Sequence, residues 1–339
     1  MKPKPIVLDA DVLGRQRTGD ETYVRNLLRE LASLAAESGI RLAAVTRRPD
    51  LVPKGVEPVP LAARSQELRM AFSLPRVLRR LGAGLCHTQY ALPFRSPCPC
   101  VVTVHDLSFV RHPELMGRRD RFVFRRVVPR AVRRAARVLT VSERTKGDLV
   151  ELYGVAPARI VVTPNGVDPA FGPGTGSRDY VLAVGAIQKR KNQVAALDAA
   201  AAVGLPLVIA GPPKDLELAE ELRRRGARLE GHVEKERLAE LYRGAACLVQ
   251  TSRFEGFGLP VLEAMASGTP VVAVHEHALE EVAGDAAVFV EQDRVADGIR
   301  QALGDRERLV AAGLERARAF SWRATAERTL AVYREILEP

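Results

Sequence analysis

The sequence predicts an α/β protein built from two doubly wound, Rossmann-like domains that face each other across a cleft. Three observations support this fold class. Short buried strands alternate with amphipathic stretches, which is typical of βαβ units in a parallel sheet. The alternation is broken once, by a segment rich in Gly and Pro, and then starts again. The length of 339 residues is also more than one compact domain usually needs.

The first domain is expected over residues 1–168, where short apolar runs recur between longer stretches that have one polar face. Its expected strands are 6–8, 41–45, 101–104 and 137–141, and an amphipathic helix is expected over 23–36. We also expect a C-terminal helix, about residues 320–339, to pack back on this domain.

The second domain is expected over residues 180–319. The segment before it, residues 169–179, is rich in Gly and Pro and is interpreted as a linker. After the linker, the expected strands are 180–184, 207–211, 246–250 and 271–274. Ligands of parallel α/β sheets bind beyond the carboxyl ends of the strands. The residues that directly follow these strands are therefore the candidates for chemistry.

The composition is that of a basic globular chain. It has 51 Lys and Arg against 41 Asp and Glu, which gives a net charge of +10. This charge favours polyanionic partners such as phosphorylated ligands, anionic lipid or nucleic acid. The alternative is that the Arg-rich composition simply reflects a GC-rich genome. The N-terminal apolar run is too short for a signal peptide, and no window is long enough to cross a bilayer. We therefore expect a cytoplasmic protein.

The most informative segment is 251–270, which follows a predicted buried strand. Gly256 and Gly258 allow a tight backbone path, and Pro260 suits the first turn of a helix that Gly268 ends. A helix that begins after such a loop attracts phosphate through its free N–H groups and its dipole. Glu255 and Glu263 are poor phosphate ligands, but their carboxylates accept hydrogen bonds from sugar hydroxyls. The alternative interpretation is a capped helix with solvated glutamates.

A second candidate is the basic turn after the strand 180–184. The strand ends at Gly185, and Arg190 and Lys191 precede the next expected helix. Cations at this position suit a phosphate group, although a solvated basic turn is the open alternative.

Histidines give two further candidates. His105 follows the strand 101–104, where a functional His is plausible, and Asp106 could orient its ring. His275 and His277 suit two ligands on one strand face, but no third metal ligand is evident in the sequence. We therefore expect no metal site.

These motifs resemble those of the family 4 glycosyltransferases of the GT-B fold, a group that includes glycosyl transferases group 1 and mannosyltransferases. Glu255 and Glu263 match the two glutamates of the family's E-x7-E segment, and residues 184–192 and 103–109 are similar to two further family segments. The resemblance covers nearly the whole chain. It implies a retaining, metal-independent hexosyltransferase that uses a GDP- or UDP-linked sugar as substrate and has no cofactor.

The resemblance also implies roles for individual residues. Glu255 would contact the transferred sugar and Glu263 the donor ribose. His105 would lie near a hydroxyl of the sugar and near the acceptor. The remaining donor-binding residues implied are Gly19, Gly185, Arg190, Lys191, Val233, Phe257, Gly258 and Leu259.

Three positions of the matched segments need separate mention. Many family members have an Arg directly after the Gly of the phosphate-binding turn, where this chain has Ala186. Asp20 and Glu21 stand where several relatives have a second Gly after Gly19, so the acceptor contacts could differ. Residues 164–168 are family-like and are interpreted as a structural turn.

A basic stretch runs from Arg118 to Arg137 and contains nine arginines with Phe and Val between them. A basic amphipathic helix of this kind can lie on anionic lipid. We favour an ordinary surface helix that is interrupted at Pro129, and keep peripheral contact with the inner membrane face, or an anionic acceptor, as alternatives.

The predicted function is transfer of a hexose from a nucleotide-diphosphate sugar to a hydroxyl acceptor, in cell-surface polysaccharide or glycolipid synthesis. The acceptor could be a glycan, a lipid-linked molecule or a small molecule. Alternatives are a nucleotide-sugar epimerase or phosphorylase on the same fold, a catalytically silent scaffold, and a basic nucleic-acid-binding protein. No RNA-binding motif or helix-turn-helix supports the last of these, so no nucleic acid is expected as partner.

Overall fold

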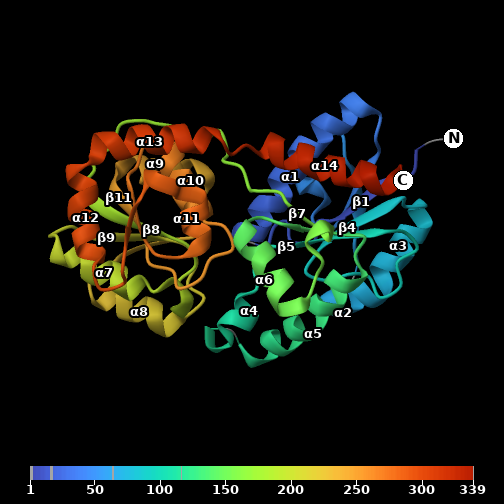
Figure 1. The fold of residues 1–339 in the computed structure, drawn as a ribbon, viewed down its shortest axis with the longest axis horizontal. Helices are drawn as coiled ribbons and strands as arrows, with labels where there is room; N and C mark the ends of the chain where they lie inside the picture. The colour runs from blue at the N-terminus through green and yellow to red at the C-terminus, as the bar shows by residue number, and fades with distance from the viewer. Residues whose placement is uncertain (1–2, 16–17, 63–64, 116, 339) are drawn as a thin grey trace. The chain divides into compact units, whose positions relative to one another are not determined.

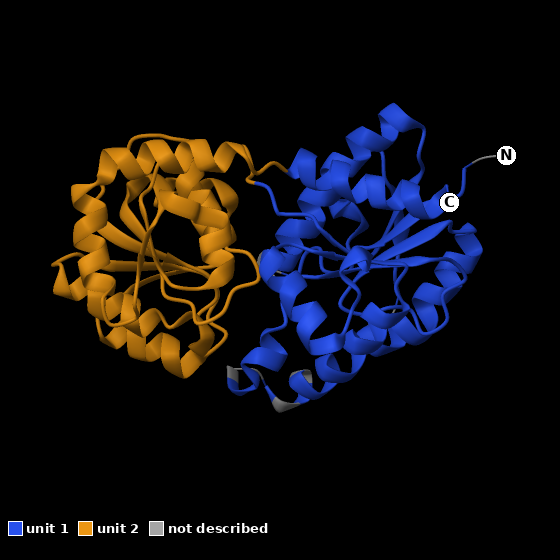
Figure 2. Ribbon diagram, in the orientation of Figure 1, with its two compact units in different colours: residues 1–166, 322–339 blue, residues 167–321 orange. Residues whose placement is uncertain are grey.

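The computed structural model describes residues 3–15, 18–62, 65–115 and 117–338. The chain forms two compact units, which Figures 1 and 2 show: unit 1 is Met1–Gly166 with Trp322–Pro339, and unit 2 is Val167–Ser321. Each unit has one parallel sheet covered by helices. The predicted fold class, α/β with two doubly wound domains, is therefore confirmed.

Unit 1 has a seven-stranded sheet in the order β3-β2-β1-β4-β5-β6-β7. Its strands are β1 (Ile6–Asp9), β2 (Leu42–Thr46), β3 (Glu57–Pro60), β4 (Leu85–Gln89), β5 (Cys100–Val104), β6 (Arg137–Thr140) and β7 (Ile160–Val162). The sequence analysis did not predict β3, β4 or β7. The first contains two prolines, the second carries polar residues in place of an apolar run, and the third is only three residues long.

The helices of unit 1 include one that returns from the end of the chain. They are α1 (Thr18–Ser38), α2 (Gln66–Leu68), a π-helical turn (Arg69–Ser73), α3 (Leu74–Leu81), α4 (Ser108–Arg111), α5 (Arg118–Arg134), α6 (Glu143–Tyr153) and α14 (Trp322–Leu337). The ring of Trp322 meets that of Tyr23 edge-on at 6.3 Å, and the Tyr333 hydroxyl lies 2.5 Å from Nδ1 of His87. These buried contacts attach α14 to unit 1.

The helix α5 runs without a break through Pro129, so the expected interruption was wrong. Proline removes one backbone donor and usually kinks a helix. Here Val128, Ala131 and Val132 are buried in one apolar cluster with Val102 of β5, and this packing holds the helix together across the proline.

Unit 2 has a six-stranded sheet in the order β10-β9-β8-β11-β12-β13. Its strands are β8 (Tyr180–Val184), β9 (Leu207–Ala210), β10 (Arg228–Gly231), β11 (Ala245–Gln250), β12 (Val271–Val274) and β13 (Val288–Val290). The four expected strands are present. The two strands that were not predicted, β10 and β13, are the edge strands, which are short and only partly buried.

The helices of unit 2 are α7 (Gln193–Ala202), α8 (Leu216–Arg224), α9 (Lys235–Gly244), α10 (Leu259–Ala266), α11 (His277–Ala283), α12 (Val295–Gly304) and α13 (Arg306–Arg318). Helix α7 and helix α12 pack on one apolar cluster with the central strands. Burying one Val or Leu side chain there contributes about 1.5–3 kcal/mol.

Residues 171–179 form neither helix nor strand, as their Gly and Pro content suggests. They are nevertheless attached to unit 2. The ring of Phe171 is buried against Tyr242, with centroids 5.7 Å apart, and the N–H of Arg178 donates to the carbonyl of Gly244 at 2.8 Å. Among the helices built from described residues, none is long and apolar enough to cross a bilayer.

A close backbone approach fixes the loop that follows β8. Gly211, at the end of β9, has φ +156°, and a Cβ at this position would collide with the carbonyl of Gly185. A residue with a side chain would therefore push the loop after β8 away from the sheet.

We predict that Gly211→Ala destabilises the protein by about 3 kcal/mol or more, because strain and a backbone clash add together. Gly204→Ala is the matched control, since Gly204 also has positive φ (+73°) but open space around the Cβ position. The control should cost only about 1–2 kcal/mol. Urea denaturation followed by fluorescence measures both, and equal losses would contradict the clash.

Candidate functional site

Two loops of unit 2 emerge side by side where the strand order reverses. The loop of residues 185–192 follows β8, and the loop of residues 251–258 follows β11, the strand that pairs with β8. The next strand after β8 lies on its other side, so this is the switch point of the sheet. Ligands of doubly wound sheets bind at such points.

Hydrogen bonds lock the two loops together. The Thr251 hydroxyl donates to the carbonyls of Lys191 and Asn192 at 3.0 and 2.9 Å. The N–H of Arg253 donates to the carbonyl of Arg190 at 3.0 Å, and the Arg190 guanidinium donates to the carbonyl of Phe254 at 2.9 Å. The basic turn is thus held in a defined place.

Glu255 is the centre of this arrangement. Its carboxylate is buried, with 7% of the residue exposed. Lys191 Nζ lies 2.5 Å from Oε1, the side-chain amide of Gln250 donates to Oε1 at 2.6 Å, and Arg190 lies 3.4 Å from Oε2. Two sequence-predicted cations and a predicted carboxylate therefore form one cluster.

The cations decide the ionisation of Glu255. Burial raises the pKa of this carboxyl, but the charges of Lys191 and Arg190, with hydrogen bonds from Lys191 and Ser252, outweigh burial and lower the pKa to about 2. Glu255 is therefore ionised at neutral pH.

The loop ends in the helix α10, as predicted. Gly258 has φ +112° and a Cβ there would lie 2.9 Å from the Leu279 side chain, so the position requires glycine. Leu259 and Pro260 begin the helix. Pro260 has no N–H, and the N–H of Val261 already donates to the carbonyl of Gly258 at 3.0 Å, so Gly258 and Leu259 carry the N–H groups at the start of the helix. The ring of Phe257 is buried and meets that of Phe320 at 5.9 Å, so this ring packs in the interior of unit 2.

Glu263 lies one turn into α10 and has a different environment. The hydroxyl of the buried Tyr242 donates to Oε2 of Glu263 at 2.8 Å. Burial raises the pKa of Glu263 to about 7; the Tyr242 hydrogen bond opposes this, and the charge of Asp168 supports it. Asp168 in turn pairs with Lys235 at 2.6 Å, so the segment interpreted as mainly structural also affects the pKa of Glu263.

Two more predicted residues lie in unit 2. Gly185 ends β8, and a Cβ there would lie 3.2 Å from Cε of Lys191, so the glycine makes room for the lysine. Val233 lies in the loop between β10 and α9 and is partly buried.

His105 directly follows β5 in unit 1 and is buried. Burial lowers the pKa of the imidazole below its ordinary value, although the charges of Asp20 and Asp106 oppose the shift. Its Nε2 lies 4.0 Å from a carboxylate oxygen of Asp20 and has no hydrogen-bond partner among the described residues. The ring meets Tyr23 edge-on at 4.7 Å. The lowered pKa favours the neutral imidazole, and Nε2 is a buried nitrogen without a hydrogen-bond partner among the described residues.

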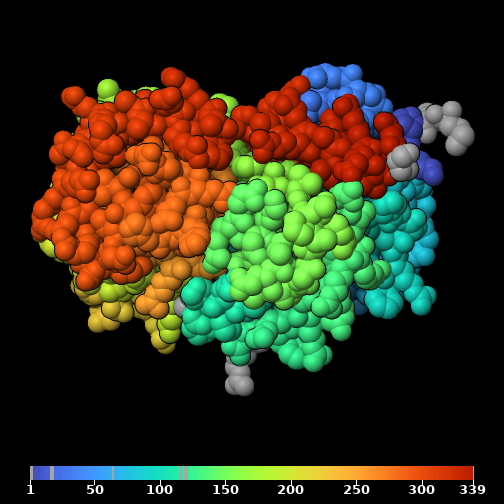
Figure 3. All heavy atoms as spheres, in the orientation of Figure 1, coloured from blue at the N-terminus to red at the C-terminus, as the bar shows by residue number. Residues whose placement is uncertain are grey.

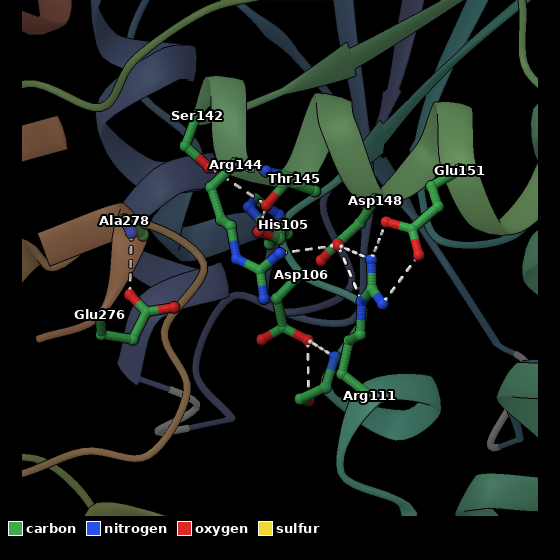
Figure 4. A network of polar contacts seen from close by, with 11 residues as sticks. His105, Asp106, Arg111, Ser142, Arg144, Thr145, Asp148, Glu151, Glu276 and Ala278 are labelled. Carbon is green, nitrogen blue, oxygen red and sulfur yellow. Dashed lines mark hydrogen bonds and ion pairs between the residues drawn. The ribbon is translucent and has the colours of Figure 1, made fainter. Parts of the chain in front are cut away.

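Asp106 does not orient His105. Its carboxylate accepts hydrogen bonds from the N–H and the hydroxyl of Ser108 at 3.0 and 2.8 Å, at the start of α4 (Figure 4). A hydrogen bond from Thr145 to the His105 carbonyl holds the backbone instead.

Gly19 lies in the first turn of α1, and a Cβ there would meet nothing within 4 Å. Arg17, at the start of the segment that suggested Gly19, lies outside the described residues. The structure therefore gives no steric reason for a glycine at this position.

A hollow lies at the corresponding switch point of unit 1, between β1 and β4. Its lining is Asp9, Val12, Arg15, Asp20, Gln66, Arg69, Gln89, Tyr90 and Phe124. The buried Arg69 contacts both Asp9, at 3.3 Å, and Asp11. Its Nε has no hydrogen-bond partner within the part of the chain that the structure describes.

The sequence analysis missed Gln250, Tyr242 and Arg69. Gln250 ends β11, so its position at a strand's carboxyl end was a usable signal. Tyr242 and Arg69 lie inside helical segments, where no sequence pattern separates them from ordinary residues.

The structure also places His275 and His277, the two histidines considered as metal ligands. His275 follows β12 and its Nδ1 lies 2.7 Å from Glu280, while His277 starts α11. They do not share a strand face. Glu276 accepts the N–H of Ala278 at 2.8 Å and caps that helix (Figure 4).

Two family profiles match the chain in sequence. The profile described as Glycosyltransferase Family 4 matches residues 17–171, and that described as Glycosyl transferases group 1 matches residues 173–318. The chain belongs to the family 4 glycosyltransferases. The resemblance drawn from Glu255, Glu263, Lys191 and His105 is thereby confirmed at the level of the family.

Named relatives of this glycosyltransferase are themselves glycosyltransferases. The O-antigen chain mannosyltransferase B of Escherichia coli is 30% identical, over 69% of this chain and 70% of that protein. The D-inositol 3-phosphate glycosyltransferase 1 of Catenulispora acidiphila is 30% identical, over 78% of both chains. That of Acidothermus cellulolyticus is 33% identical, but the matched region spans only 62% of its length.

Solved structures support the GT-B fold. The sucrose-phosphate synthase of Thermosynechococcus elongatus has a TM-score of 0.80 at 20% identity, over 98% of this chain and 99% of that one. Anabaena HepE, solved in complex with UDP-glucose, has a TM-score of 0.76 at 16% identity, again over 98% and 99%. None of these comparisons supports an epimerase, a phosphorylase, a scaffold or a nucleic-acid-binding protein.

We predict that Glu263→Gln stabilises the glycosyltransferase in a pH-dependent way. A carboxyl whose pKa is raised in the folded state stabilises it at low pH, and loses that contribution as pH rises from its ordinary value of 4.5 to about 7. Glutamine does not titrate. The melting temperature of Glu263→Gln relative to wild type should therefore rise by several degrees between about pH 5 and about pH 8. Calorimetric scans measure it. The exposed Glu236→Gln on α9 is the control, and a difference independent of pH would contradict the assignment.

Proposed function

We propose that this enzyme is a retaining, metal-independent glycosyltransferase that moves a hexose from a nucleotide-diphosphate sugar to a hydroxyl acceptor. The observation that carries the proposal is the buried cluster of Glu255 with Lys191, Arg190 and Gln250, set beside the first turn of α10. The cluster combines two cations for a diphosphate with a carboxylate for sugar hydroxyls.

The donor diphosphate would bind between the basic turn and α10. Lys191 and Arg190 supply two positive charges, and the free N–H groups at Gly258 and Leu259 supply donors with the favourable end of the helix dipole. These groups are already held in place, so they stabilise the charge that develops as the sugar–phosphate bond breaks. Gly185 leaves the space that Lys191 needs.

Glu255 would position the transferred sugar. Its pKa of about 2 keeps it ionised, so it accepts hydrogen bonds from hydroxyls and steadies positive charge on the sugar ring. We infer attack from the same face as the leaving group, with the leaving phosphate accepting the acceptor proton. Glu263 would accept from the ribose, and the backbone near Val233 would border the base.

Unit 1 would contribute the acceptor side. The lowered pKa of His105 favours the neutral imidazole, and its buried Nε2 lacks a hydrogen-bond partner among the described residues. An acceptor hydroxyl that reaches this nitrogen would supply that partner, as donor or acceptor according to the tautomer. The hollow at the β1–β4 switch point suits a hydroxyl-rich molecule, because carboxylates and amides line it and its Arg69 is already paired with Asp9 and Asp11.

The named relatives guide the choice of substrates. HepE was solved with UDP-glucose, and another relative is named as a mannosyltransferase of an O-antigen chain. We propose a UDP- or GDP-linked hexose without a further cofactor, and a glycan, lipid-linked or small-molecule acceptor in cell-surface polysaccharide or glycolipid synthesis. We also propose a cytoplasmic enzyme that contacts the inner membrane face through the stretch from Arg118 to Arg137.

Two measurements test the chemical class. A product whose anomeric configuration is opposite to that of the donor sugar, seen by NMR, would contradict retention. Activity that a chelator abolishes and added Mg²⁺ restores would contradict metal independence.

We predict that Lys191→Ala weakens binding of UDP or GDP by about 10- to 100-fold, the cost of one lost charge-assisted hydrogen bond. Isothermal calorimetry with each nucleotide measures it. Lys189→Ala is the matched control, because Lys189 lies in the same turn and is exposed. Equal affinities for the Lys191 variant and wild type would overturn the diphosphate assignment.

We predict that Glu255→Gln lowers kcat for transfer by about 100-fold or more, because a preorganised charge at the reacting centre is lost. Affinity for the nucleotide should not fall, since Lys191 loses an ion-pair partner and remains available to phosphate. Single-turnover kinetics and calorimetry separate the two effects. An unchanged kcat in a folded Glu255→Gln protein would remove Glu255 from the site.

A further inference from the structure

Three large apolar side chains lie exposed on unit 1 and are not among the residues that line the hollow proposed for the acceptor. They are Phe72 in the π-helical turn, Phe94 in the loop after β4 and Phe122 on α5, and they are 54%, 65% and 57% exposed. Leu68 beside Phe72 is also 54% exposed. Exposed phenylalanines gathered on one surface indicate an interaction site more often than chance.

Each of these phenylalanines carries an arginine on its ring. The guanidinium carbon of Arg76 lies 5.7 Å from the Phe72 centroid, that of Arg95 lies 5.8 Å from Phe94, and that of Arg126 lies 4.2 Å from Phe122. These are cation–π distances. We define the Phe–Arg surface as these three pairs together with the exposed arginines of α5, which are Arg125, Arg130, Arg133 and Arg134.

The pairs belong to one region of unit 1. The N–H of Phe94 donates to the carbonyl of Met70, two residues before Phe72, at 2.9 Å. Arg134, near the end of α5, donates to the carbonyl of Phe94 at 3.0 Å. Beneath them, Val127 of α5 packs on the same apolar cluster as Met70 and Leu74.

Helix α5 presents its arginines outward. Arg125, Arg126, Arg130, Arg133 and Arg134 are exposed beside Phe122, whereas Val128, Ala131 and Val132 face the core. Atoms of α5 form part of the molecular surface in the green region of Figure 3. Arg121, Phe122, Arg125 and Arg126 also line a shallow, open hollow on the surface of α5.

The surface has almost no compensating negative charge in its own sequence. Residues 68–105 contain five arginines and residues 121–142 contain seven, and neither range contains Asp or Glu, although Glu67 and Asp120 directly precede them. Arg69 pairs with Asp9 and Asp11, and Arg137 pairs with Glu335, so the other ten arginines carry the excess charge. The comparable patch on α8 of unit 2 differs. There, the exposed Leu216 and the arginines 223–225 are interleaved with Glu217, Glu220 and Glu221, and Arg223 pairs with Glu220 at 2.5 Å.

The chemistry favours a lipid surface over a nucleic acid. Nucleic-acid platforms stack bases on open aromatic faces, but arginines already cover the faces of these three rings. Apolar side chains that project among arginines match the bilayer interface, where rings enter the headgroup layer and guanidinium groups meet phosphates.

We propose that the Phe–Arg surface docks unit 1 on a membrane that contains anionic phospholipid. This proposal rests on the proposed function, which already includes membrane contact through α5. It extends that contact to the π-helical turn, α3 and the Phe94 loop. Docking of this kind concentrates the enzyme at a surface that can hold lipid-linked acceptors. It does not depend on which sugar is transferred.

Vesicle co-sedimentation tests the proposal with the full chain. Wild-type protein should bind vesicles of equimolar phosphatidylcholine and phosphatidylglycerol, bind phosphatidylcholine vesicles far less, and lose binding as salt rises. The triple variant Arg126→Gln, Arg130→Gln, Arg133→Gln should lose roughly 100-fold in affinity, at about tenfold or less per arginine. The variant Phe72→Ala, Phe94→Ala, Phe122→Ala should also bind more weakly.

The control is the α8 variant Leu216→Ala, Arg223→Gln, Arg224→Gln, which should bind vesicles as wild type does. Equal binding of wild type to both vesicle types, or unchanged binding of the two Phe–Arg surface variants, would overturn the proposal. So would tight binding of a single-stranded oligonucleotide without vesicle binding. UDP and GDP affinities measured on the same preparations report folding and keep the outcome separate from that of the donor site.

Discussion

The ion pair between Lys191 and Glu255 is the interaction on which the proposed donor site depends. It joins the loops that follow β8 and β11, the two strands that flank the switch point of the unit 2 sheet. A buried carboxylate without a partner costs several kcal/mol, so both loops must adopt the conformation that keeps the pair intact. Gln250, Arg190 and the backbone bonds between the loops add to the same constraint. The site is therefore organised before any ligand arrives.

Two glutamates eight positions apart on one loop and helix titrate very differently. Glu255, beside two cations, has a pKa of about 2, and Glu263, beside Tyr242 and near Asp168, has a pKa of about 7. The chemistry of the side chains is identical, so the environment alone makes the difference. Charged side chains are also paired at the switch point of unit 1, where Arg69 contacts both Asp9 and Asp11. Both units thus place paired charges where the sheet leaves a crevice.

Prediction from sequence succeeded where a local pattern carries the information. Most inner strands of the two sheets are short apolar runs, and Gly258 with Pro260 marks the start of α10 within a few residues. The exception is β4, the middle strand of unit 1, whose polar residues hid it from prediction. Prediction failed where the pattern is weak or misleading. The edge strands β3, β10 and β13 are short and half exposed, and Pro129 suggested a break that the buried side of α5 overrides. Asp106 follows His105 directly, yet it caps α4 instead of orienting the ring.

The sequence by itself determined the fold class, the family, and the loops and side-chain types of the proposed donor site, because these depend on neighbours within about one turn or one strand. Only the tertiary structure decided which cation meets Glu255, since Lys191 lies 64 residues away and reaches it through the pairing of β8 with β11. It also decided that Tyr242 shares a hydrogen bond with Glu263, and that the loop of Phe94 bonds to both Met70 and Arg134. Contacts of this kind join residues that are far apart in the sequence and meet only in the folded sheets, so no short-range pattern encodes them.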